Sequence, residues 1–162
     1  MSEEVLAVVN VSVARRWLAI GLLLLVGGAM IYAAFTAPPS AALQAFLIAG
    51  GALALWMADK MRRATETWLE LTQTELRDNT GRILARVADI RSLDRGFLAF
   101  KPSNGFLIRT KTPGPRAWMP GLWWRAGRRI GVGGVTSGVQ TRIMADLIAA
   151  MVRQRDQDSQ ST

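Results

Sequence analysis

The chain has 162 residues, enough for one ordinary domain and a smaller additional unit. It contains neither cysteine nor histidine, so disulfides, thiolate catalysis, structural zinc sites and triads with an imidazole base are excluded. Twenty lysines and arginines against 12 acidic residues give a formal net charge of +8. Anionic partners are therefore favoured: lipid head groups, nucleic acid or an acidic protein surface.

Residues 1–14 form a short segment ahead of the most apolar part of the chain, and we expect it to lie in the cytoplasm. The run from Val5 to Val13 alternates like a strand. The same apolar run would also suit a helix lying at the membrane interface. The residues leave both alternatives open.

Residues 15–63 are predicted to form a two-helix transmembrane hairpin. The 42 residues from 17 to 58 carry no formal charge, and only Pro38-Pro39-Ser40 interrupts the apolar run. The spans over 17–37 and 41–58 are each about long enough to cross a hydrocarbon core of about 30 Å at about 1.5 Å per residue. Helices satisfy their own backbone groups there, and the glycines within the spans permit close packing.

Positively charged residues flank both predicted spans, and the loop between the spans has no charge. The positive-inside rule therefore predicts a protein of the bacterial inner membrane with both termini in the cytoplasm. Seven flanking side chains are expected to anchor the hairpin at the membrane interface: Arg15, Arg16, Trp17, Trp56, Lys60, Arg62 and Arg63. A cleaved signal sequence or a buried soluble hairpin would be the alternatives, but the second apolar run and the scarcity of polar positions argue against both.

Residues 64–155 change to short alternating segments separated by turn residues, which is typical of antiparallel strands. The expected elements, in order, are a strand over 67–72, a strand–turn–strand unit over 75–87 with Gly81 in the turn, a helical turn or irregular edge over 88–96, a hairpin over 97–110, a proline-rich loop over 111–121, and two strands over 122–134 bent at Ala126–Gly127.

A C-terminal helix is predicted over 137–155, where apolar residues recur with helical period. Ser137 and Gln140 have the spacing of a capping box at its start. Residues 156–162 are expected to be a disordered tail. The fold class predicted from these elements is an α+β membrane protein: a transmembrane hairpin followed by a small antiparallel β-barrel or bent sheet that a C-terminal helix caps.

Two stretches resemble bacterial pleckstrin-homology-like (PH-like) domains. The stretch "LELTQTELRDNTGRILARVADIRSLDR" is similar to the opening strands of those domains, and "WRAGRRIGVGG…MADLIAAM" is similar to their last strands and helix. The resemblance covers about residues 65–152, and its motifs are loose. It implies a binding scaffold without a catalytic signature, in a family with members that help to assemble photosynthetic or respiratory complexes.

A basic, tryptophan-containing stretch is the candidate contact surface. Between Asp94 and Asp146 there are nine basic residues and no acidic residue. Trp123 and Trp124, as neighbours on a strand, must point to opposite faces, so one is expected in the core and the other at the surface. The residues predicted to contact a partner or lipid are Trp118, Trp123, Trp124, Arg125, Arg128 and Arg129.

The predicted function is a non-enzymatic, membrane-anchored interaction module. It would act as an assembly factor or accessory subunit docking on another inner-membrane protein complex, or form a homo-oligomer. The alternative is a PH-like module that binds anionic lipids at the cytoplasmic leaflet. No catalytic residue or metal site is predicted, because the carboxylates have no histidine or cysteine beside them. No cofactor site or nucleic-acid partner is predicted, because no phosphate-loop or recognition-helix pattern accompanies the glycines and arginines.

Overall fold

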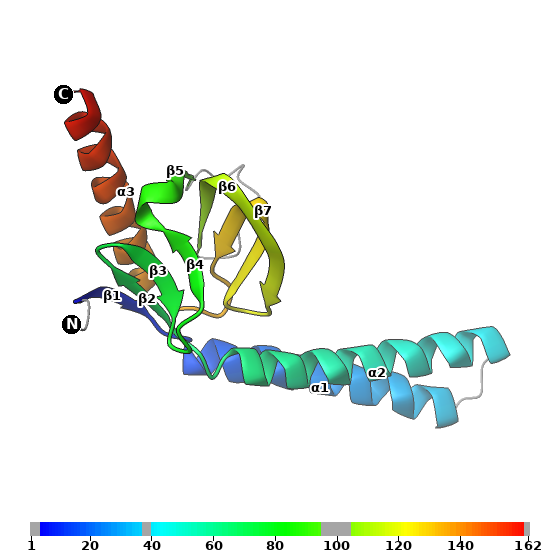
Figure 1. Cartoon of the computed structure of the whole chain (residues 1–162). Helices are drawn as coiled ribbons and strands as arrows, with labels where there is room; N and C mark the ends of the chain where they lie inside the picture. The colour runs from blue at the N-terminus through cyan, green and yellow to red at the C-terminus, as the bar shows by residue number, and fades with distance from the viewer. Residues whose placement is uncertain (1–3, 37–39, 95–104, 161–162) are drawn as a thin grey trace.

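The computed structural model describes residues 4–36, 40–94 and 105–160 (Figure 1). The elements in chain order are β1 (Val5–Val9), α1 (Val13–Thr36), α2 (Ala41–Ala64), β2 (Leu69–Thr72), β3 (Glu75–Asp78), β4 (Ile83–Arg86), the 3₁₀ helix η1 (Val87–Asp89), β5 (Ile90–Asp94), β6 (Phe106–Met119), β7 (Trp123–Val132) and α3 (Gly138–Gln160). Two long apolar helices thus project from a domain of two antiparallel sheets and one C-terminal helix.

The N-terminal segment belongs to the sheet domain. Strand β1 pairs antiparallel with β2, with Val8 opposite Glu70 and Val9 opposite Leu69, and it forms one edge of the four-stranded sheet β1-β2-β3-β4. The strand alternative is therefore confirmed. The residues ahead of the hairpin are part of the sheet domain and do not form a separate segment. The α1–α2 hairpin is inserted between the first two strands of the domain, so both of its ends emerge on the same side.

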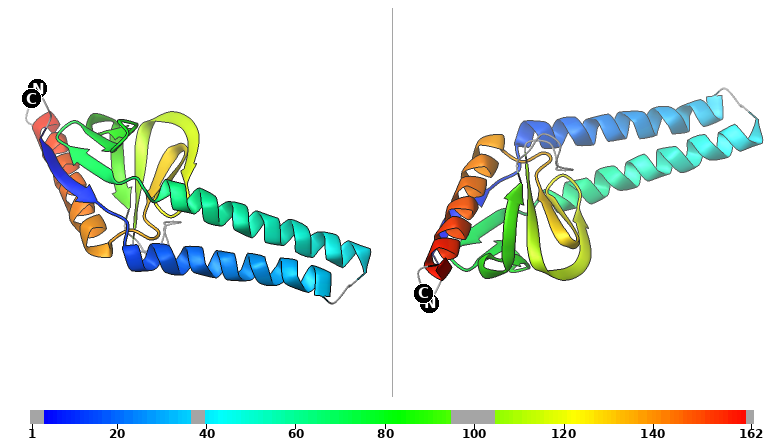
Figure 2. Two further views of the ribbon diagram at one scale, coloured as in Figure 1. Left: turned by 90° about the horizontal axis from the view of Figure 1, so that it is seen from below. Right: turned by 90° about the horizontal axis from the view of Figure 1, so that it is seen from above.

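Helices α1 and α2 lie side by side and extend away from the sheets (Figures 1 and 2). Each has 24 residues, or about 36 Å at about 1.5 Å per residue. Both are long and apolar enough to span a membrane, and most of their surface is exposed rather than packed against the domain. The prolines expected to form the connection lie outside the described residues.

Small side chains let the two helices approach closely. A Cβ atom on Gly51 would lie 2.9 Å from the carbonyl oxygen of Gly27, so neither position accommodates a larger residue without a shift. Gln44, one of the few polar residues in the hairpin, donates from Nε2 to the carbonyl oxygen of Ala34 at 3.0 Å. On α1 the buried residues Ile20, Gly27 and Ala34 repeat every seven positions, as in a left-handed helical pair. On α2, Gly51 and Ala58 have the same spacing, and Met61 and Ala64 are also buried at the end that joins the domain.

The second sheet has the order β5-β6-β7. Strand β6 continues through the region predicted as a proline-rich loop, and β7 is one strand where two were expected. Pro113 and Pro115 are tolerated because the pairing is interrupted between Arg109 and Gly114 and again between Gly114 and Ala117, and irregularities of this kind do not need the missing N–H groups. The bend expected at Ala126–Gly127 is made by Gly127, with φ at +60°, without ending the strand.

The other predicted strands agree with the structure. The strand over 67–72 corresponds to β2, and the unit over 75–87 corresponds to β3 and β4, with Gly81 at φ +85° between them. The stretch expected as a helical turn or an irregular edge contains both η1 and β5. Of the hairpin expected over 97–110, the second strand is the start of β6, whereas the first strand and its turn lie outside the described residues.

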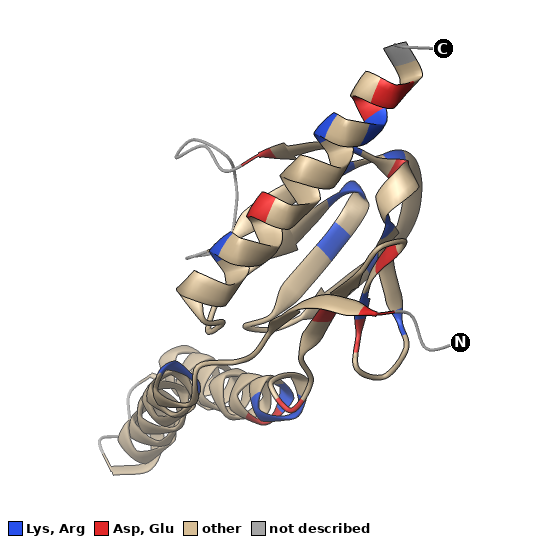
Figure 3. Ribbon diagram, turned by 90° about the vertical axis from the view of Figure 1, so that its left-hand side faces the viewer, with Lys and Arg blue, Asp and Glu red and all other residues tan. Residues whose placement is uncertain are grey.

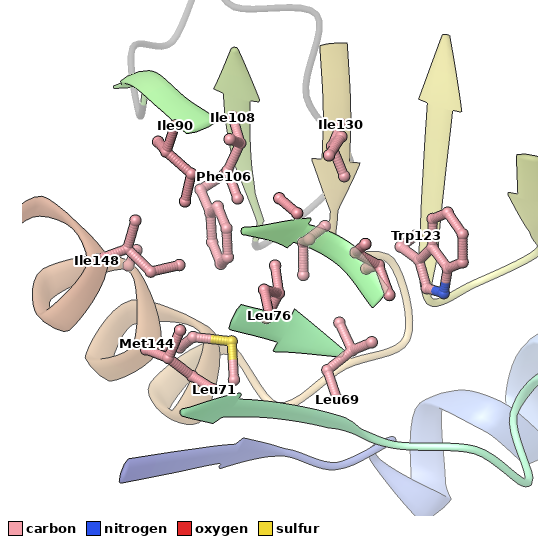
Figure 4. Close-up of a cluster of buried hydrophobic side chains, with 14 of the residues drawn as sticks. Leu69, Leu71, Leu76, Ile90, Phe106, Ile108, Trp123, Ile130, Met144 and Ile148 are labelled. Atoms are coloured by element: carbon pink, nitrogen blue, oxygen red, sulfur yellow. The ribbon is translucent and has the colours of Figure 1, made fainter. Parts of the chain in front are cut away.

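Side chains from both sheets and α3 form the core (Figure 4). Leu69, Leu71 and Leu76 come from the four-stranded sheet, and Phe106, Ile108 and Ile130 come from the three-stranded one. Met144 and Ile148 of α3 close the core with no exposed surface. Apolar residues spaced for one helix face were therefore sufficient to predict that α3 packs against the sheets.

Helix α3 differs from the prediction at both ends. It continues to Gln160, beyond the end expected at residue 155, and Arg155 donates to the carbonyl oxygens of Val87 and Ile90, which fastens this turn to the domain. At its start, Gln140 accepts a hydrogen bond from the backbone N–H of Asn10 at 2.8 Å. The predicted capping box is therefore replaced by a contact to the segment that follows β1.

Candidate interaction surface

The base of the hairpin is fastened to the domain by arginines predicted as membrane anchors. Arg15 donates to the carbonyl oxygen of Thr136 at 3.1 Å. Arg16 donates to the carbonyl oxygens of Thr65 at 3.4 Å and Arg62 at 3.2 Å. These bonds join α1 to the end of α2 and to the segment that precedes α3, so the two arginines hold the domain against the hairpin as well as flanking it with positive charge.

Ion pairs neutralise part of the positive charge that follows α2. Arg63 lies 2.7 Å from Asp59, and Arg62 lies 3.3 Å from Asp59 and 3.6 Å from Glu66. These pairs are largely exposed, so each contributes little to stability. Charged side chains occur on the hairpin only at the ends that join the domain (Figure 3).

Lys60 connects the hairpin to the three-stranded sheet. Its Nζ lies 4.7 Å from the ring centroid of Trp56 and 4.9 Å from that of Trp118, which is within the range of a cation–π contact with both rings. Trp118 is near the end of β6, far from Lys60 in sequence. The structure therefore brings together two predicted membrane anchors and one predicted contact residue at the domain-proximal end of α2.

The three tryptophans of the candidate surface have different environments. Trp123 is 3% exposed and lies in the core, as expected for one of two neighbouring strand residues. Trp124 points away from the core, but it is half-buried because its indole packs on the backbone of Gly131. Trp118 is the cross-strand partner of Trp124 and is 47% exposed. Trp118 is thus the most exposed of the three, with Trp17 and Trp56 exposed on the helices.

Arg125 holds the two sheets together. Its Nη1 donates to the carbonyl oxygen of Leu84 in β4 at 2.7 Å, and its Nε donates to the carbonyl oxygen of Gly127 at 3.2 Å. The guanidinium group lies over Gly114, where any side chain would collide with it. Arg125 was predicted as a contact residue, but its side chain donates hydrogen bonds within the domain.

Arg128 and Arg129 are exposed, and no described ion pair includes either of them. Arg129 lies directly opposite Arg109 across the β6–β7 pair. Arg109 is one of the nine basic residues between Asp94 and Asp146, but the sequence does not indicate that it lies beside Arg129. Strand register is needed to see this pair, because the two residues are 20 positions apart.

Asp89, which lies near a turn in the sequence, has a structural partner. Its two carboxylate oxygens accept hydrogen bonds from the backbone N–H of Thr112 at 3.1 Å and from its hydroxyl at 2.7 Å. These contacts fix the irregular part of β6 against η1. Among the residues that the structure describes, no group of three His, Cys, Asp or Glu side chains could hold a metal ion.

Comparison of the chain with family models, curated proteins and solved structures finds no match. The functional argument therefore depends on the geometry of the hairpin, its junction with the domain and the exposed side chains of β6 and β7.

Proposed function

We propose that the chain is a non-enzymatic interaction module of the bacterial inner membrane. The hairpin anchors a cytoplasmic, PH-like domain, which docks on another membrane protein complex as an assembly factor or accessory subunit. The PH-like assignment is supported by a four-stranded sheet, a three-stranded sheet and a C-terminal helix that share one core.

The pairing of β1 with β2 across the base of the hairpin is the observation that carries this proposal. Because α1 and α2 interrupt the domain between two hydrogen-bonded strands, the domain cannot swing away on a flexible linker. Arg15 and Arg16 add side-chain bonds at the same junction. A domain held in this way presents a constant face to whatever lies beside the hairpin in the membrane.

The exposed part of β6 and β7 is the docking face in this proposal. Trp118 and Arg128 are exposed there, and tryptophan and arginine are the residue types that most often dominate binding energy at protein interfaces. Trp118 also lies beside Lys60 at the end of α2, so a partner that contacts it would meet the hairpin and the domain together.

Co-purification of the full chain from membranes in mild detergent tests the proposal. We expect a specific membrane protein to accompany the wild-type chain and to be lost from a Trp118→Ala/Arg128→Glu variant. A Val139→Ala/Arg142→Glu variant is the matched control, because it removes an exposed apolar side chain and reverses an exposed arginine on α3. A wild-type chain that purifies without a partner, or a partner that both variants retain, would contradict the proposal.

A further inference from the structure

Three side chains that can donate hydrogen bonds form a row across the three strands of the second sheet. Ser92 of β5 lies opposite Arg109 of β6, and Arg109 lies opposite Arg129 of β7. Directly opposed residues present their side chains on the same face of a sheet. All three residues are exposed, so the row consists of one hydroxyl group and two guanidinium groups that face solvent.

The opposition of two arginines costs stability unless an anion lies between them, because like charges directly opposite one another repel. None of the described ion pairs includes Arg109 or Arg129. The nearest carboxylate in the register is that of Asp94, which lies two residues along β5 and opposite Leu107, two rows from the Ser92–Arg109 pair. The row itself therefore keeps two positive charges without a carboxylate between them.

A phosphate group fits this arrangement of donors. Guanidinium groups present planar, paired N–H donors that match phosphate oxygens, and the serine hydroxyl supplies a further donor at the end of the row. The same sheet reaches the hairpin, since Trp118 of β6 packs on Lys60 of α2. Strands β6 and β7 lie beside α2, whereas α3 lies on the opposite side of the domain (Figures 1 and 2).

The geometry points to a phospholipid-binding site: the Ser92–Arg109–Arg129 row binds the phosphate of an anionic phospholipid in the leaflet that the hairpin enters. This inference rests on the membrane anchoring in the proposed function, and it adds a ligand that does not depend on a protein partner. The bound phosphate offsets the repulsion between the two arginines, so the domain is more stable on an anionic surface than on a neutral one.

The test compares thermal unfolding of the full chain in nanodiscs of phosphatidylcholine and of an equimolar mixture of phosphatidylcholine and phosphatidylglycerol. Tryptophan emission reports the unfolding of the domain, in which Trp123 is buried. We expect phosphatidylglycerol to raise the midpoint of the wild-type chain by a few degrees. In an Arg109→Gln/Arg129→Gln variant the rise should vanish, and the midpoint in phosphatidylcholine should be equal to or above that of the wild type.

An Arg142→Gln/Arg153→Gln variant is the matched control, because it removes the same charge from exposed positions on α3 and should keep the full rise. A rise that persists in Arg109→Gln/Arg129→Gln, or that disappears equally in the control, would overturn the site. Inorganic phosphate added to phosphatidylcholine nanodiscs shows whether the bound phosphate group comes from a lipid or from free phosphate. If it reproduces the wild-type rise, the ligand is free phosphate and the assignment to lipid is wrong. No protein partner is present in these nanodiscs, so failure of co-purification would not affect the result.

Discussion

Replacement of Arg125 by alanine should destabilise the cytoplasmic domain, because this side chain joins β7 to β4. The variant removes the bond to the carbonyl oxygen of Leu84, a residue that is 1% exposed, and the bond to the carbonyl oxygen of Gly127. A hydrogen bond with one charged partner contributes about 1.5–3 kcal/mol, and a buried carbonyl left without a donor costs its desolvation.

The two hydrogen bonds do not contribute equally, so the expected loss of stability is smaller than twice the value for one bond. The bond to Leu84 is short, at 2.7 Å, and crosses between the sheets, whereas the bond to Gly127 is 3.2 Å long and spans two residues of one strand. Arg125 is also only half-buried, so water replaces part of what is lost. We therefore expect a loss of about 2–3 kcal/mol in the free energy of unfolding, close to the value of the inter-sheet bond alone.

Thermal unfolding of the full chain, followed by circular dichroism and tryptophan emission, measures this loss. For a domain of this size it corresponds to a fall in midpoint of about 10–20 °C. Arg128→Ala is the control, because Arg128 is exposed and its side chain makes none of the described hydrogen bonds; its midpoint should match that of the wild type. Equal midpoints for Arg125→Ala and Arg128→Ala would refute the structural role and return Arg125 to the predicted contact surface.

Three further predictions concern the core and the hairpin. Met144→Asp should prevent the domain from folding, because it places a charge at a position with no exposed surface, whereas Val139→Asp, at a position 72% exposed, should retain the wild-type circular dichroism spectrum. Gly27→Leu should lower the thermal stability of the chain in detergent, because even a Cβ atom there would lie 3.1 Å from a backbone oxygen of the facing helix; Gly28→Leu, with open space around it, should not, and equal effects would contradict the described packing. Because the chain has no natural cysteine, Ser40→Cys can be labelled uniquely, and we expect an impermeant maleimide to reach it only from the side of the membrane opposite the domain. Labelling from the domain side would show that the hairpin does not span.

The strands with simple local patterns were predictable. Leu69 and Leu71 alternate with polar residues and lie in β2, and Gly81 lies in the tight turn between β3 and β4. The helical spacing of Met144 and Ile148 was enough to predict that α3 packs on the core, but Val139 and Ile143, which belong to the same apolar stripe in the sequence, are exposed. These features depend on backbone conformation and side-chain period, which neighbouring residues determine.

The extent of β6 could not be predicted in the same way. Its prolines favour a loop when only local preferences are considered, but pairing with β7 carries the strand past them through an irregular register. The role of Arg125 was hidden for a similar reason. An arginine in a basic, glycine-rich stretch gives no sign that its donors reach the backbone of a strand about 40 residues earlier.

By itself, the sequence determined that this protein has an apolar hairpin of membrane-spanning length, a small antiparallel domain and a helix that packs on it. Charge-free length and residue period are local properties, so they are visible without a structure. The tertiary structure alone decided that β1 completes the sheet beyond the hairpin, that Lys60 lies between Trp56 and Trp118, and that Arg109 faces Arg129. Each of these contacts joins residues far apart in the chain, and only strand register and packing bring them together.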